Sequence, residues 1–373
     1  MGLSRIKGQD RAVGRLQAAF EADRLPHAYL FVGPEGVGKE TTALEFARAL
    51  NCERGGFDGC GECRSCTMTG SLSHPDLHLI FPVPTTAKPG EIAERIAGQI
   101  ERGFREADFG RRTAIISVET VVRDVVLKAN QHAYVGRWKV FIISDADLMT
   151  TEAANTLLKT LEEPPQETVI VLTSSRPSAL PVTIVSRCQR VPFARLSEDD
   201  LVEALISEPR LGFDEKRARR VAGFALGSPG RAVRLESDGF HRQMDEIAAI
   251  MAGRKTRDVP SLVSEAGRLA FRLGRREQQE VLDLMLLWLR DVLALSECGD
   301  GARLLYAKHR KDLEAQASAM TSEVIGTLVE RVDGARRAIE RYSNPSIVFT
   351  SVLLDLAIAR KQTRTGNGAR HGG

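Results

Sequence analysis

Residues 28–40 read Ala28-Tyr29-Leu30-Phe31-Val32-Gly33-Pro34-Glu35-Gly36-Val37-Gly38-Lys39-Glu40, and this stretch decides the fold of the 373-residue chain. The apolar run at its start predicts a buried strand, and Glu40–Leu50 then repeats apolar residues at helical spacing. Between them lies the pattern G-x-x-x-x-G-K, in the strand-to-helix context that a phosphate-binding loop requires. Backbone N–H groups of such a loop surround phosphate oxygens, and its lysine supplies a positive charge. The candidate nucleotide-binding residues are therefore Gly33, Gly36, Gly38, Lys39 and Glu40.

Two further apolar runs predict buried strands of a parallel sheet. They are Val140–Ser144 (VFIIS) and Thr168–Thr173 (TVIVLT). The helical pattern of Thr151–Glu162 separates them, and Pro164 and Pro165 end that helix. Strands that alternate with helices in this way predict a doubly wound α/β layer, with helices flanking the sheet.

The character of the chain changes after about Phe193, because strand-like runs end and amphipathic helical patterns punctuated by Gly and Pro follow. A small helical lid is expected around the turn Gly227-Ser228-Pro229-Gly230, and a helical bundle beyond it. The predicted domains are an α/β head at 1–195, a helical lid at 196–240, an all-α domain at 241–361 and a disordered tail at 362–373. The loop-plus-helix insertion at Pro82–Arg112 receives no role.

Two patterns in the all-α domain predict particular helices. An apolar stripe at near-heptad spacing needs neighbouring helices to cover it, and consists of Val281, Met285, Trp288, Val292 and Leu295. Asn344-Pro345 predicts an N-cap followed by Pro at the first helical position, which opens a final helix through Ile358. The segment Lys361–Gly373 is polar and glycine-rich, which predicts disorder.

The composition is that of an ordinary globular protein, with 43% hydrophobic and 27% charged residues. Its 52 basic and 49 acidic residues give a net charge of +3, so any contact with nucleic acid must be local. The first residues lack the apolar core of a signal peptide, and the apolar runs are too short to span a membrane. We expect a cytoplasmic protein without a membrane partner.

Four of the six cysteines lie close together in the chain, namely Cys52, Cys60, Cys63 and Cys66. Their two CxxC steps can each bind one edge of a tetrahedral metal ion, and four thiolates close the coordination sphere of zinc. A reducing cytoplasm disfavours disulfides, and a redox pair would need a thioredoxin-like helix start. We therefore predict a structural Zn²⁺ site without catalytic function. His74 and His78 are expected to be turn and core residues, and Cys188 and Cys298 to lie outside the metal site.

Two catalytic positions of the predicted nucleotide site carry unusual residues. Glu40 stands where a Ser or Thr hydroxyl normally ligates Mg²⁺, and Ala146 where an acid normally polarises water. Asp145 fits the Mg²⁺-binding acid, whereas Asp147 is expected to cap the following helix. Glu40 also has a simpler interpretation, as a first-turn acid that complements the helix dipole. We expect weak or no ATP hydrolysis by this chain, and the binding of ATP and Mg²⁺ stays an open alternative.

Several segments together carry a resemblance to a known family. They are Lys7-Gly8-Gln9-Asp10, Arg24-Leu25-Pro26-His27-Ala28, the cysteine cluster with His74-Pro75-Asp76 after it, Ser144-Asp145-Ala146-Asp147-Leu148-Met149, Glu152-Ala153-Ala154-Asn155 and Leu161-Glu162-Glu163-Pro164-Pro165. Over roughly its whole length, apart from the insertion and the tail, the chain resembles the bacterial clamp-loader family of AAA+ proteins, and within it the delta-prime subunits. The resemblance implies an α/β AAA+ P-loop head with an embedded zinc module at 52–66, a small helical lid and a C-terminal all-α collar that assembles with other subunits.

The resemblance also implies roles for three single residues. Ser186-Arg187-Cys188 resembles the family's SRC motif, which implies that Arg187 is an arginine finger reaching a neighbour's ATP in trans. Thr173 resembles the sensor-1 residue, and Arg231 stands where the lid carries the sensor-2 arginine. An ordinary packing or surface role is the alternative for both arginines.

The function implied by the resemblance is that of a stationary subunit in a hetero-pentameric clamp loader. Its expected partners are gamma/tau motor subunits and delta, with the sliding clamp and primed DNA reached through the complex. That complex belongs to the DNA polymerase III holoenzyme, and nothing in this chain resembles a polymerase site. Two alternatives are an ATP-hydrolysing motor subunit of the gamma/tau type and a separate DNA-binding AAA+ ATPase. ATP turnover by the purified chain, or its strongly salt-dependent DNA binding, would indicate one or the other.

Overall fold

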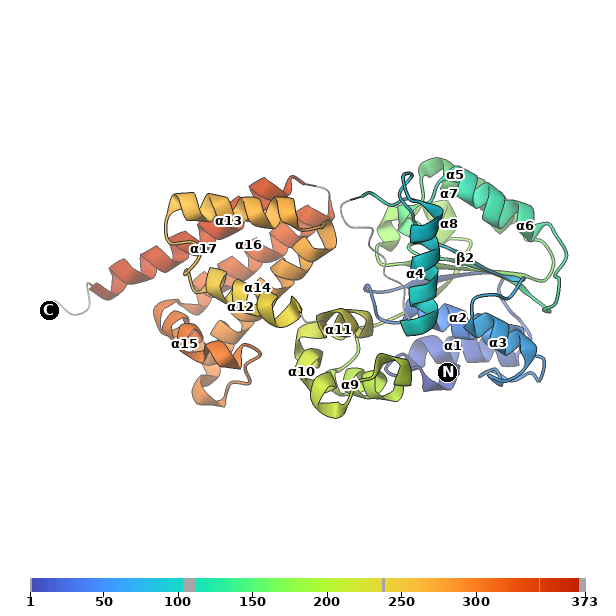
Figure 1. Cartoon of the computed structure of the whole chain (residues 1–373), viewed down its shortest axis with the longest axis horizontal. Helices are drawn as coiled ribbons and strands as arrows, with labels where there is room; N and C mark the ends of the chain where they lie inside the picture. Colours follow the sequence, from blue (N-terminus) through green and yellow to red (C-terminus); the bar gives the residue numbers. More distant parts are fainter. Residues whose placement is uncertain (1, 103–111, 237–238, 342, 369–373) are drawn as a thin grey trace. The chain divides into compact units, whose positions relative to one another are not determined.

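The computed structural model describes residues 2–102, 112–236, 239–341 and 343–368 (Figure 1). The chain divides into two compact units, Met1–Glu236 and Ser237–Gly373. The first unit contains a parallel sheet with helices, and the second is helical throughout its described part. This arrangement confirms the predicted fold class of an α/β head followed by helices.

A five-stranded parallel sheet forms the centre of the first unit, in the order β2-β3-β4-β1-β5. The strands are β1 (Ala28–Val32), β2 (Leu77–Ile80), β3 (Lys139–Ile143), β4 (Thr168–Ser174) and β5 (Gln189–Pro192). The predictions of β1, β3 and β4 are confirmed, because these inner strands are buried along their length and read as apolar runs. The sequence analysis missed β2 and β5, which are edge strands whose short segments mix polar and apolar residues.

Helices cover both faces of this sheet. Leu30 and Val32 of β1 belong to one apolar core, and Tyr29 and Phe31 belong to the other. The first core is completed by α5 (Val118–Val121), the π-helical turn η2 (Val122–Val126), α6 (Leu127–Ala129), α7 (Thr151–Glu162) and α8 (Val182–Val185). The second core is completed by α1 (Asp10–Glu21) and α2 (Lys39–Leu50), so the head has three layers with the sheet in the middle.

The predicted helix between β3 and β4 is confirmed as α7, but its predicted cap is wrong. Thr150 caps α7, because its hydroxyl accepts a hydrogen bond from the backbone N–H of Ala153 at 3.2 Å. Asp147 lies inside a 3-10 turn, η3 (Ala146–Leu148), which ends before α7 begins. The Asp147 carboxylate instead accepts a hydrogen bond from Ser174 Oγ at 2.7 Å and pairs with Arg176 Nε at 3.0 Å.

The remaining helices of the first unit lie near the start of the chain, in the cysteine segment, in the insertion, after β4 and in the predicted lid. They are η1 (Leu3–Arg5), α3 (Arg64–Gly70), α4 (Pro89–Arg102), η4 (Pro177–Ala179), α9 (Glu198–Ser207), η5 (Pro209–Leu211), α10 (Glu215–Ala225) and α11 (Pro229–Leu235). The insertion thus contains α4, and its residues 103–111 lie outside the described part. Residues 196–236 form one compact unit with the head, so the boundary at 195 stays a prediction.

The second unit is a bundle of helices. They are α12 (Gly239–Met251), α13 (Val259–Arg272), α14 (Arg275–Cys298), η6 (Gly299–Gly301), η7 (Ala307–His309), α15 (Arg310–Ala319), α16 (Ser322–Glu340) and α17 (Pro345–Gly368). The predicted apolar stripe is buried on α14, and Trp288 at its centre donates a hydrogen bond to Gln316 Oε1 at 2.8 Å. Gly239 and Phe240 begin α12, so they fold with this bundle and not with the predicted lid.

The final helix is longer than predicted. Asn344 Oδ1 accepts a hydrogen bond from the backbone N–H of Ser346 at 3.0 Å, as expected for a cap. Helix α17 extends to Gly368, and residues 369–373 lie outside the described part, so the disordered tail at 362–373 stays a prediction. Among the described residues, no helix is both long and apolar enough to cross a membrane.

Candidate functional site

The predicted nucleotide-binding residues of the head lie together at the C-terminal ends of the parallel strands. The phosphate loop follows β1, Asp145 follows β3, and Thr173 lies near the end of β4. The backbone N–H of Asp145 donates a hydrogen bond to Thr173 Oγ1 at 3.1 Å. Ligands of open α/β sheets commonly bind at this end of the strands, so these groups lie where a ligand of such a sheet is expected.

Lys39 is already engaged by the phosphate loop itself. Its ammonium donates hydrogen bonds to the carbonyl oxygens of Gly33 and Pro34, each at 2.7 Å. Burial lowers the pKa of Lys39, and the nearby carboxylates of Asp145 and Glu35 oppose that shift. The positive charge therefore lies inside the loop, surrounded by backbone oxygens and acids.

Glu40 is also held by a group within the head. Its carboxylate accepts a hydrogen bond from the hydroxyl of Ser144, at the end of β3. The position of Glu40 in the first turn of α2 lets its negative charge complement the helix dipole, which supports the simpler of the two interpretations. The same charge would oppose a nucleotide phosphate at this place. Sequence reasoning missed Ser144 as the partner, since the two residues are 104 positions apart.

Ala146, in the position of the catalytic acid, is fully buried in the apolar core beneath the sheet edge. A methyl group there can neither polarise water nor hold a proton. The acid that follows, Asp147, is bound to Ser174 and Arg176 as described above. The carboxylate of Asp147 is thus engaged by contacts within the head.

The turn that begins α11 packs directly on the phosphate loop. Ser228 Oγ donates to the carbonyl oxygen of Glu35 at 3.0 Å, and the backbone N–H of Gly230 donates to that of Gly36, also at 3.0 Å. Gly36 has a φ of 72°, and a Cβ atom there would lie 2.4 Å from Ser228 Oγ, so only glycine fits. Gly38, with a φ of 99°, precedes α2. Arg231 follows in α11 as a buried residue whose backbone N–H donates to Ser228 Oγ.

Arg187 lies near the N-terminal ends of the parallel strands, whereas the phosphate loop lies at their C-terminal ends. It precedes β5, whose first residue Gln189 pairs with Tyr29 near the start of β1, whereas the phosphate loop follows Val32 at its end. A strand of five residues spans about 16 Å, which is farther than an arginine side chain extends. Arg187 therefore cannot serve the phosphate loop of its own chain.

The Arg187 guanidinium is partly exposed and has two partners. Nη2 pairs with Glu162 Oε1 at 2.7 Å, and Nη1 donates to the carbonyl oxygen of Thr183 at 3.1 Å. About a third of the arginine side chain, 36%, is accessible to solvent. The sequence pattern did not indicate this pairing, because Glu162 and Arg187 are far apart in the chain.

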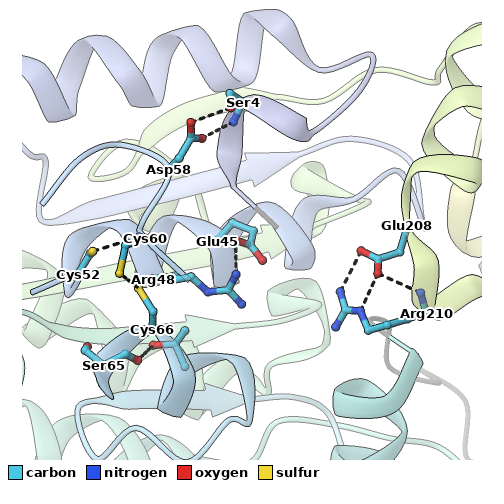
Figure 2. Close-up of polar contacts among 11 residues, drawn as sticks. Ser4, Glu45, Arg48, Cys52, Asp58, Cys60, Ser65, Cys66, Glu208 and Arg210 are labelled. Atoms are coloured by element: carbon cyan, nitrogen blue, oxygen red, sulfur yellow. Dashed lines mark hydrogen bonds and ion pairs between the residues drawn. The ribbon is translucent and has the colours of Figure 1, made fainter. Parts of the chain in front are cut away.

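The four clustered cysteines come together as predicted. Their Sγ atoms all lie within 4.8 Å of one another, and Figure 2 shows Cys52, Cys60 and Cys66 turned toward a common centre. In a tetrahedral zinc site with four thiolates, neighbouring sulfur atoms are about 3.8 Å apart; the separation of Cys60 and Cys66 here is 3.9 Å. The cluster can therefore hold a metal ion, and its donor set fits zinc.

Backbone N–H groups support the thiolates of this cluster. The N–H groups of Cys60 and Cys63 donate to the Sγ atoms of Cys52 and Cys60, each at 3.2 Å. Backbone N–H donors, that of Cys63 first, lower the pKa of the Cys60 thiol to about 6, while burial raises the pKa of the Cys66 thiol to about 12. A bound cation would favour the deprotonated form of both thiols.

Arg48 of α2 lies beside the cysteine cluster (Figure 2). Its Nη1 pairs with Glu45 Oε2 at 2.9 Å, and both side chains are largely buried. A Cβ atom at Gly59 would lie 3.1 Å from Arg48 Cγ and 3.5 Å from Cys66 Sγ. Arg48 and Cys66 thus pack against the same glycine, a relation that the sequence did not indicate.

The two histidines near the cluster are used elsewhere. His74 is buried, with Nε2 at 2.9 Å from Ser65 Oγ and Nδ1 accepting from the backbone N–H of Asp76 at 3.1 Å. Burial lowers the pKa of His78 to about 4, and its ring packs on Phe141. Cys188 and Cys298 lie outside the cluster of cysteines, as expected.

The chain is similar in sequence to proteins of known families. The family described as "DNA polymerase III, delta subunit" matches residues 8–197, more than half of the chain. DNA polymerase III subunit delta' of Bacillus subtilis is 30% identical over 354 residues, which cover 93% of this chain and 96% of that protein. Subunit delta' of Escherichia coli is 32% identical over 222 residues, or 59% of this chain and 58% of that protein. DNA polymerase III subunit tau of Bacillus subtilis is 30% identical over 236 residues, or 62% of this chain and 36% of that protein. The chain therefore belongs to the family of DNA polymerase III delta-prime subunits.

Proposed function

We propose that this chain is the stationary subunit of a bacterial clamp loader, which donates Arg187 to the ATP site of a neighbouring motor subunit. Its partners would be gamma/tau-type motor subunits and delta in a hetero-pentamer, and the complex would load the sliding clamp onto primed DNA. With this role the chain would act in the cytoplasm, as part of the DNA polymerase III holoenzyme. Polymerisation would belong to other subunits of that assembly.

One observation carries this proposal. Arg187 is partly exposed near the N-terminal ends of the parallel strands, whereas the phosphate loop of the same chain lies at their C-terminal ends. A guanidinium in that place can reach a triphosphate only on another chain. An arginine finger neutralises charge that develops on the transferred phosphoryl group, and contributes about 10³- to 10⁵-fold to the rate at one site. The internal contacts of Lys39 and Glu40 support the complementary half of the proposal, in which this chain's own loop turns over little or no ATP.

The cysteine cluster is proposed to bind one structural Zn²⁺ through Cys52, Cys60, Cys63 and Cys66. Four thiolates leave no open position for a substrate, so the ion would hold the glycine-rich segment against α2 without taking part in ATP chemistry.

The test is a loader reconstituted with wild-type, Arg187→Ala or Arg187→Lys protein. We expect the arginine variants to assemble normally and to lose ATPase and clamp-loading rate, with the loss limited by the motor sites that Arg187 does not serve. Arg137→Ala is the matched control, because Arg137 is another exposed arginine of the head, 66% accessible. Unchanged rates with Arg187→Ala would reject the role in trans.

The motor alternative rests on the retained pattern G-x-x-x-x-G-K and is tested with the isolated chain. Brisk ATP turnover by purified protein with Mg²⁺ would favour that alternative, and would contradict the stationary role. We expect turnover far below that of a motor subunit.

A further inference from the structure

We propose that Glu162 is a positioning residue for Arg187: together with the carbonyl of Thr183, its carboxylate holds the guanidinium in the orientation that a neighbour's triphosphate requires. The inference rests on the proposed function of Arg187. It assigns a defined task to an exposed carboxylate that otherwise has none.

Some N–H groups of the Arg187 guanidinium are bound within the chain, and the others are available to a neighbour's triphosphate. Glu162 engages Nη2 and Thr183 engages Nη1, at the 2.7 Å and 3.1 Å given above. A guanidinium carries five N–H donors in one rigid plane, so two contacts fix the plane and leave further donors for phosphate oxygens. A flexible arginine side chain without such contacts would sample many rotamers before it met its target.

Both acceptors are carried by elements that the core holds in place. Glu162 is the last residue of α7, whose Leu157 and Leu161 are buried, and Pro164 ends the helix just beyond it. Thr183 belongs to α8, which is anchored by the fully buried Ile184. The orientation of Arg187 is therefore set by the packing of α7 and α8 against the sheet.

The strength of the ion pair suits this task. The side chains of Arg187 and Glu162 are 36% and 49% accessible, and exposed ion pairs of this kind contribute little to stability. Glu162 can thus orient Arg187 without competing strongly with a triphosphate, which carries several negative charges.

The experiment uses the reconstituted loader with Glu162→Ala and Glu162→Gln. We expect Glu162→Ala to lower kcat for ATP about fivefold to tenfold while assembly and KM change little. Glu162→Gln keeps an oxygen acceptor and should recover most of the rate. Glu163→Ala is the matched control, since Glu163 is the adjacent exposed carboxylate, and among the described residues Arg187 pairs with Glu162 and not with Glu163.

Two results would overturn the inference. One is a Glu162→Ala loader as fast as the Glu163→Ala loader, and the other is a faster loader, which would indicate that Glu162 competes with phosphate. The double variant Arg187→Ala/Glu162→Ala should be no slower than Arg187→Ala alone, because a positioning residue acts only through its arginine. A further loss in the double variant would show a general structural role instead.

The same series separates this inference from the proposed function. If Arg187→Ala slows the loader and Glu162→Ala does not, only the role of Glu162 fails. If Arg187→Ala has no effect, the proposed function itself fails.

Discussion

The two ends of helix α2 carry two glycine-rich segments that have kept their binding groups to very different degrees. At the N-terminal end, the phosphate loop retains its glycines and Lys39, but Lys39 and Glu40 are bound by groups of the head itself. At the C-terminal end, the cysteine cluster brings four sulfur atoms within 4.8 Å of one another, which is a complete ligand set. A sequence motif for a binding site can therefore be present while its side chains bind other groups of the protein. The contacts of those side chains decide which ligand the motif can bind.

The turn of α11 sharpens this contrast. Ser228 and Gly230 donate hydrogen bonds to the backbone of the phosphate loop, so contacts within the protein hold this loop. We propose that the cysteine cluster gains its cohesion from a bound cation, because a cation favours the thiolate form of the cysteines and offsets the repulsion between the four negative charges. One end of α2 is therefore stabilised by protein contacts, and the other by a proposed metal ion.

The largest effect is expected at the cysteine cluster, from Cys66→Ser. Loss of one of four thiolates opens the coordination sphere, so the metal content should fall from about one zinc per chain to near zero under mild chelation. Metal analysis and the thermal unfolding of the chain measure the change, and the melting temperature should fall with the metal. Cys298→Ser is the control, because Cys298 is an exposed cysteine outside the cluster. Full retention of metal by Cys66→Ser would contradict the proposal that all four cysteines bind the ion.

A smaller effect is expected from Arg48→Met, which removes the cation beside the cluster. A zinc ion with four thiolates carries net negative charge, and a buried guanidinium nearby offsets it while its stem packs on Gly59. Removing such a supporting group typically costs about 10-fold or more in metal affinity. The rate of zinc transfer to a chelator measures the effect. Arg137→Met is the control, since the exposed Arg137 pairs with Asp23, and equal rates for both variants would contradict the role of Arg48.

The smallest effect is expected at the phosphate loop, from Glu40→Thr. This change removes a negative charge and restores a hydroxyl for Mg²⁺, so Mg-ATP should bind up to about tenfold more tightly, or ~1.4 kcal/mol. Calorimetric titration with and without Mg²⁺ tests it, and the gain should vanish without the ion. Should the wild-type chain bind Mg-ATP as tightly as the variant, the contacts of Glu40 would not limit this site.

Sequence reasoning predicted the elements whose signals are local. The apolar runs of β1, β3 and β4, the helix α7 before Pro164, and the cysteine spacing each report on neighbouring residues in the chain. The edge strands β2 and β5 were missed because half-exposed strands mix polar and apolar residues. The final helix runs past Ile358, where the apolar pattern ends, because a helix can continue beyond the residues that pack in the core.

The sequence by itself determined the α/β head, the following helices, the four-cysteine ligand set and the loss of the hydroxyl at Glu40 and of the acid at Ala146. Only the tertiary structure decided which partners those residues have: Ser144 for Glu40, backbone carbonyls for Lys39, and Glu162 for Arg187. Local patterns reflect backbone periodicity and bond chemistry, which act over a few residues. Pairings between distant residues depend on strand order and on the packing of helices against the sheet, and so they exist only once the chain has folded.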